Sequence, residues 1–183
     1  HSFVRFHGET QIKEENMTEA IVYTSGTGFT AEYAKMFGEE TGLRCLTLKE
    51  AKKELAPGAE IIYFGWIMAD NVKGCKKAMK RYSVRAAVGV GLGPCGSRLE
   101  EVAAASGTSG VPLFTLQGGF DISKLHGVYK LMMKIFTGAV TKKLNAKPKR
   151  TPDEEKLLAL MRGGSAVSRD NLLPVLDFYK ETQ

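Results

Sequence analysis

Cysteine is scarce in this sequence, and the few cysteines are far apart. The chain of 183 residues has three, Cys45, Cys75 and Cys95, and none of them forms a CxxC pair. A disulfide framework or a zinc site needs paired or closely spaced cysteines. The sequence therefore argues against both and predicts free thiols.

Long apolar runs and nucleic-acid motifs are also missing. No apolar stretch reaches the roughly 20 residues that a membrane-spanning helix needs, and residues 1–16 lack the pattern of a signal peptide. We expect residues 1–16 to be a leader or a cloning-derived segment, and residues 17–183 to form a single cytoplasmic domain. The net charge of +6 favours anionic partners. Without an RNP, helix-turn-helix, KH or zinc-finger pattern, we expect no nucleic acid among them.

Short apolar runs alternate with longer amphipathic stretches from residue 20 onward, which predicts parallel strands joined by helices. We expect strands at residues 20–24, 44–48, 60–65, 86–92 and 113–116. We expect helices at residues 30–41, 72–82, 97–105 and 123–140, another that begins with a capping box at Thr151 and Glu154, and a last one near 171–181. The strands at 60–65 and 86–92 are apolar on both faces, as in a sheet covered on both sides. The predicted fold is a three-layer, doubly wound α/β domain with extra C-terminal helices.

The loop after the first strand has an unusual composition: Ser25, Gly26, Thr27, Gly28, Phe29 and Thr30. It lies between a strand and a helix, where backbone N–H groups and the helix dipole favour an anion. The glycines let the backbone approach a ligand closely. The sequence therefore predicts a phosphate site at this loop.

Several phosphate ligands compete for this site. A P-loop is excluded because no Lys-Ser or Lys-Thr pair closes the segment. A dinucleotide remains an alternative, since Gly26, Gly28 and Ala31 match its looser fingerprint and Glu50 follows about 20 residues later. The hydroxyls favour the terminal phosphate of flavin mononucleotide (FMN), whose three free oxygens accept more hydrogen bonds than a diester can. These hydroxyls belong to Thr24, Ser25, Thr27 and Thr30.

The same loop resembles the phosphate loop of the flavodoxin family, Ser/Thr-x-Thr-Gly-x-Thr, at Ser25, Thr27, Gly28 and Thr30. The resemblance covers roughly residues 17–140. It implies a five-stranded sheet of order 2-1-3-4-5, with FMN at the carboxyl ends of the strands. The segment from 118 to 134 is similar to the subgroup that contains menaquinone-dependent protoporphyrinogen oxidase.

The resemblance also implies where the flavin rings lie, against the loops after the third and fourth strands. These loops contain Trp66, Ile67, Met68 and Ala69, and Gly91, Leu92, Gly93 and Pro94. Small electron-shuttle members usually have a tyrosine in the second loop and a glycine in the first, and this chain has neither. We expect an FMN-binding electron-transfer protein. The alternatives are an FMN-dependent oxidoreductase acting on a quinone or porphyrinogen-like substrate, and a flavin-free interaction module.

Residues 122–150 form a basic segment without a single Asp or Glu. Its basic residues are Lys124, Lys130, Lys134, Lys142, Lys143, Lys147, Lys149 and Arg150. Interleaved apolar residues predict an amphipathic helix, which we expect to pack on the sheet with its lysines in water. The same lysines can face a redox partner protein or an anionic membrane. The expected partners are therefore a redox protein or a quinone, with peripheral contact at the inner membrane face through 122–150.

Overall fold

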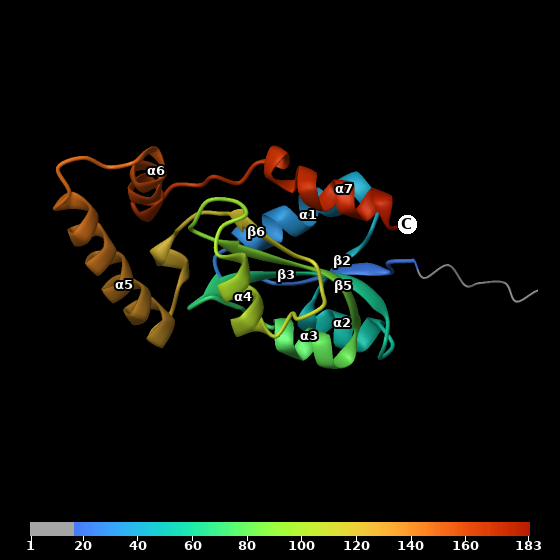
Figure 1. Ribbon diagram of the computed structural model, residues 1–183. Coiled ribbons are helices and arrows are strands. Elements are labelled where there is room, and N and C mark those ends of the chain that lie inside the picture. Colours follow the sequence, from blue (N-terminus) through green and yellow to red (C-terminus); the bar gives the residue numbers. More distant parts are fainter. Residues whose placement is uncertain (1–16) are drawn as a thin grey trace, which may run out of the picture.

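Five parallel strands form the central sheet of the computed structural model, which describes residues 17–183 (Figure 1). The strands are β1 (Ala20–Thr24), β2 (Cys45–Thr47), β3 (Glu60–Met68), β5 (Ser83–Gly91) and β6 (Leu113–Gln117). Their order is β2-β1-β3-β5-β6, and each neighbouring pair is parallel. The expected order is confirmed, and the fold is flavodoxin-like. The expected leader, residues 1–16, lies outside the described residues.

Helices cover both faces of this sheet (Figure 1). One face carries α1 (Phe29–Thr41) and α7 (Leu173–Glu181), and the other carries α2 (Leu48–Glu54), α3 (Cys75–Arg81) and α4 (Leu99–Ser106). Successive strand residues point to opposite faces. Ile62 and Phe64 therefore pack toward α1, whereas Ile61 and Tyr63 pack toward α2 and α3. The prediction of strands buried from both sides is confirmed.

Helix α2 was not expected from the sequence, although its start carries a recognisable signal. Thr47 accepts a hydrogen bond from the Glu50 N–H (3.2 Å), and the Glu50 carboxylate accepts one from the Thr47 N–H (2.8 Å). This capping box stabilises the first turn. The hydrogen bonds from Thr47 lower the pKa of Glu50. The Glu50 carboxylate, which the dinucleotide alternative requires as a ligand group, therefore caps the start of α2 instead.

Strand β3 continues past Gly65, where we expected it to end, to Met68, and the chain then reverses direction in a hairpin. Its last residues pair antiparallel with β4 (Asn71–Val72). The two residues between them, Ala69 and Asp70, both have left-handed φ values, of 47° and 62°. This is the backbone of a two-residue hairpin turn. The expected helix at 72–82 accordingly begins later, at Cys75.

After β6 the chain leaves the sheet in an excursion, residues 120–164, before it returns. The excursion contains η1 (Ile122–Lys124), α5 (Gly127–Asn145) and α6 (Pro152–Met161). Its two ends meet at a neck, where the Ala166 N–H donates to the Gly118 carbonyl (2.8 Å) and the Phe120 N–H to the Gly164 carbonyl (3.2 Å). The chain then continues through η2 (Arg169–Leu172) into α7.

The expectation that the helix after the fifth strand packs on the sheet is wrong. Helix α5 lies beside α6 and away from the sheet (Figure 1). The face next to α1 is instead covered by the end of η2 and by α7, where Leu172 and Val175 are fully buried. No described helix is long and apolar enough to cross a membrane.

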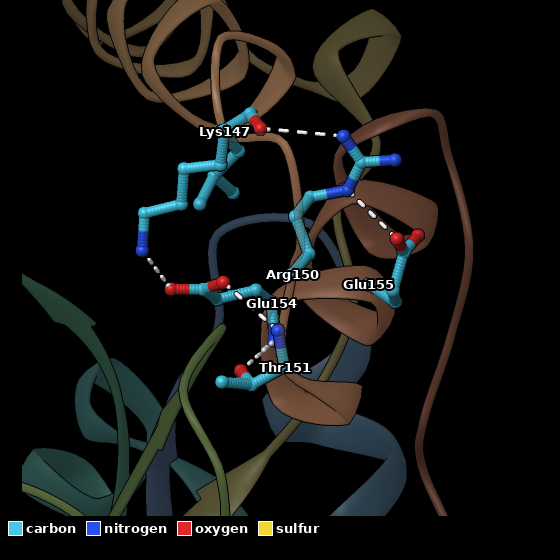
Figure 2. A network of polar contacts seen from close by, with 6 residues as sticks. Lys147, Arg150, Thr151, Glu154 and Glu155 are labelled. Carbon is cyan, nitrogen blue, oxygen red and sulfur yellow. Dashed lines mark hydrogen bonds and ion pairs between the residues drawn. The ribbon is translucent and has the colours of Figure 1, made fainter.

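A polar corner joins α5 to α6 (Figure 2). Lys147 forms an ion pair with Glu154, and Arg150 pairs with Glu155 at 2.7 Å. The Thr151 side chain accepts from the Glu154 N–H (3.2 Å), which confirms the expected capping box. Two of the basic residues in the segment 122–150 are therefore neutralised by α6.

Candidate functional site

A cavity of about 630 Å³ opens at the carboxyl ends of β1, β3 and β5. Small-molecule sites have volumes of about 300 to 1,000 Å³. Every site residue expected from the sequence lines this cavity except Ser25 and Gly28. The excursion adds an apolar wall: Phe120, Leu125, Met132, Met133 and Phe136. Three loops far apart in the sequence thus meet at one end of the sheet.

The Ser25 side chain fixes the conformation of the loop at residues 25–30. Its hydroxyl oxygen accepts hydrogen bonds from the N–H groups of Gly28 (3.1 Å) and Ala31 (3.4 Å). Gly28 has a φ of 101°, which side-chain-bearing residues rarely adopt. Among the described residues, no protein acceptor is found for the N–H groups of Thr27, Phe29 and Thr30. These donors at the start of α1 are free for an anion.

The four hydroxyls of this region divide into two pairs. Thr24 lies with its oxygen 2.7 Å from the Tyr63 hydroxyl, which donates to the carbonyl of Lys73 (2.6 Å). Burial raises the pKa of Tyr63, so it stays a neutral donor. Thr24 and Ser25 therefore serve the scaffold, whereas Thr27 and Thr30 line the cavity.

Lys124 lies at the same loop, and sequence reasoning missed this placement. Its Nζ is 3.9 Å from the point where a Cβ atom on Gly28 would lie. Its nearest carboxylate oxygen is that of Asp121, at 3.9 Å. Asp121 also accepts from the Ser123 N–H (3.0 Å), which begins η1 and directs Lys124 toward the loop. The sequence shows only one more lysine in a basic segment, because the contact joins residues far apart in the chain.

Trp66 connects the loop at 25–30 to the excursion. A Cβ atom on Gly26 would lie 3.2 Å from Cε2 of the indole, so the ring lies against this glycine. The Tyr129 ring meets the indole edge to face, with centroids 5.8 Å apart. The Lys73 ammonium lies 5.7 Å from the Trp66 centroid and 5.3 Å from that of Tyr129, within cation–π range. Trp66 therefore packs against its neighbours and lines the cavity at once.

The two loops expected near a flavin ring are fixed by their own contacts. Arg98 donates to both oxygens of Asp70, at 2.9 and 2.6 Å, which ties the β3–β4 turn to α4. These bonds lower the pKa of Asp70. The Gln117 side chain donates to the Leu92 carbonyl (2.8 Å), which anchors the loop after β5 to β6. The cavity walls are thus shaped before any ligand enters.

The cavity has two chemically different ends. One end, at the start of α1, has backbone donors and two hydroxyls, with the Lys124 ammonium beside it at Gly28. Apolar side chains dominate the remainder, from Ile67 and Met68 across to Leu125 and Phe136. Such a site suits a ligand with an anionic end and a broad apolar body.

Comparison of the chain with models of protein families, with curated proteins and with solved structures gave no match. What the structure shows is a parallel sheet of flavodoxin-like order. The function is therefore argued from the site itself.

Proposed function

We propose that this chain binds FMN in the cavity and transfers electrons. One observation carries the proposal: a single cavity is lined both by the helix start, whose backbone donors have no protein acceptor within residues 17–183, and by the mostly apolar loops after β3 and β5. The molecule FMN has the matching parts, a phosphate monoester at one end and a planar ring system at the other. When bound, it supplies one-electron and two-electron transfer.

The residues at the start of α1 fit the phosphate. Thr27 and Thr30 offer hydroxyls, the N–H groups of Thr27, Phe29 and Thr30 offer backbone donors, and Lys124 adds a positive charge. Charge-assisted hydrogen bonds of this kind are stronger than neutral ones. This donor set favours a monoester over the diester of a dinucleotide, which agrees with Glu50 being bound to its own helix.

The loops after β3 and β5 fit the ring system. Trp66 to Ala69 and Gly91 to Pro94 both line the cavity. Their role is to orient the ring and to exclude water from it. Because these loops are already held by Arg98 and Gln117, little ordering is needed on binding.

A second candidate function is an FMN-dependent oxidoreductase acting on a quinone or porphyrinogen-like substrate. The observation that favours it is the apolar wall from the excursion, since Leu125, Met132 and Phe136 extend the cavity past the two loops. An apolar second molecule fits against such a wall. A flavin-free interaction module is the third possibility, which an FMN titration distinguishes from the first two.

The test is a titration of the protein with FMN, followed by quenching of flavin fluorescence, with riboflavin as the matched ligand. We expect FMN to bind and riboflavin, which lacks the phosphate, to bind far more weakly. No binding at tens of micromolar FMN contradicts the proposal and favours the flavin-free module. Turnover with NAD(P)H and quinones, tested anaerobically, then separates the oxidoreductase from the electron shuttle.

A further inference from the structure

Helix α5 has an apolar stripe that touches neither the cavity nor α6. Val128, Leu131 and Ile135 are 70%, 60% and 66% exposed. Their spacing of three and four residues places them on one side of the helix. We call these three residues the outer stripe. Large apolar side chains exposed together mark an interaction surface.

Two other sides of α5 face the cavity and α6. Met132, Met133 and Phe136 line the cavity. Thr137 and Leu144 are buried, on the side where α5 packs beside α6. The outer stripe is therefore a third side of the helix, and packing within the chain does not explain it.

Lysines accompany the outer stripe, and they lack acidic partners. Lys130, Lys134, Lys142 and Lys143 form no ion pair among the described residues. Two acidic residues of α6, Glu154 and Glu155, are occupied by Lys147 and Arg150 (Figure 2), and the third, Asp153, forms no ion pair with these lysines among the described residues. The positive charge along α5 is thus left for an external partner.

We propose that α5 docks on an anionic lipid surface, with the outer stripe in the headgroup region and the four lysines on acidic headgroups. An apolar stripe bordered by lysines is the pattern of a helix that lies in a membrane interface. A second copy of the chain fits less well, because a two-fold contact through the stripe brings like charges together. Helix α5 lies at the far end of the molecule from the sheet, where the body leaves it accessible (Figure 1). The proposal goes beyond FMN binding and does not depend on it.

The first test is flotation of the full chain with vesicles of phosphatidylcholine, alone or mixed with phosphatidylglycerol. We expect binding to the anionic vesicles only, with loss of binding as salt rises. The variant Lys130→Gln/Lys134→Gln/Lys142→Gln/Lys143→Gln should bind up to roughly a thousandfold more weakly, at about 1 kcal/mol per lysine. The control Lys52→Gln/Lys53→Gln/Lys77→Gln/Lys80→Gln removes the same charge from α2 and α3 and should bind nearly as the parent does.

The second test removes the apolar contribution. The variant Val128→Gln/Leu131→Gln/Ile135→Gln keeps every lysine and should lose roughly tenfold or more in vesicle affinity. Its control, Met17→Gln/Leu99→Gln/Leu173→Gln, changes exposed apolar residues elsewhere and should lose little. Thermal unfolding of each variant establishes that it is folded.

Several outcomes overturn the proposal. These are absence of binding at low salt, equal binding to neutral and anionic vesicles, or equal losses in a variant and its control. A dimer in solution that the outer-stripe variant abolishes assigns the stripe to a second copy instead. Because FMN is absent from this assay, failure here and failure of the FMN titration are independent results.

Discussion

Thr27 and Thr30 line the cavity, whereas Thr24 and Ser25 form hydrogen bonds within the protein that fix the loop. From the sequence, all four hydroxyls count equally as phosphate donors. The structure halves that number and adds Lys124 instead. Two hydroxyls, three backbone N–H donors and one ammonium thus remain to bind a phosphate monoester.

Replacing Thr27 and Thr30 together by valine should weaken FMN binding and leave the fold intact. Each lost bond to a charged group is worth about 1.5 kcal/mol, so the pair should raise the Kd roughly a hundredfold. The measurement is the FMN titration. Riboflavin affinity should not change in this variant, and an equal loss for both ligands would mean that the threonines shape the cavity and do not bind the phosphate.

Lys124→Gln should weaken FMN binding by roughly tenfold at low salt. The side chain is more than half exposed, so salt screens its charge and the difference from the parent should shrink as salt rises. Lys35→Gln, on the exposed side of α1, is the matched control. A loss of the same size in Lys35→Gln would assign the effect to net charge and not to position.

The β3–β4 hairpin and the start of α4 stabilise each other through one ion pair. Asp70 and Arg98 both have left-handed backbones, with φ values of 62° and 55°. Such conformations are unfavourable for side-chain-bearing residues and persist only where contacts hold them. The two hydrogen bonds between these side chains supply that contact at the edge of the cavity.

This pair predicts a pH dependence. Arg98 lowers the pKa of Asp70 in the folded state, so its stabilising effect is complete above the ordinary aspartate pKa of about 3.9. The effect is lost as pH falls through the lowered value. The melting temperature of Arg98→Gln should lie slightly below that of the parent at neutral pH, and the gap should begin to narrow below about pH 4 and close once the pH is below the lowered pKa.

The control for this measurement is Arg162→Gln, which removes an exposed arginine that forms no ion pair among the described residues. It should show no such pH-dependent gap. A gap for Arg98→Gln that persists in acid would assign the stabilisation to packing and not to charge.

Considered as a whole, the molecule is a sheet with its helices plus an excursion attached through a narrow neck. Gly119 and Ser165 pair across the neck as an isolated antiparallel bridge. Both ends of residues 120–164 therefore lie side by side, and the core on either face of the sheet is built largely from other residues.

Replacing residues 120–164 by a short Gly/Ser linker should leave a cooperatively folding sheet. FMN affinity should fall at least about tenfold, because Lys124 and the apolar wall are removed together. Thermal unfolding and the FMN titration measure the two effects. Loss of cooperative unfolding would show that the excursion belongs to the folding core.

Local patterns in the sequence were sufficient to predict most of the strands of the sheet and the position of the loop at residues 25–30. Strand alternation and doubly apolar runs depend only on neighbouring residues, and so does the capping box at Thr151. Helix α2 was missed although Thr47 and Glu50 carry the same signal. The expected end of β3 at Gly65 was wrong because a left-handed Ala-Asp turn has no glycine to mark it.

Placement in space was decided by tertiary structure alone. Periodicity shows that both α5 and α7 have an apolar face, but it does not say which face of the sheet each one covers. Beside α1, the sheet is covered by α7. Helix α5 is consequently left to line the cavity and to expose its outer stripe, and Lys124 reaches Gly28 because η1 folds back over the loop. The sequence by itself determined the glycine and hydroxyl composition of the loop after β1 and its position between a strand and a helix, since these depend on adjacent residues. The rest of the site depends on contacts between distant segments, which only the folded chain brings together.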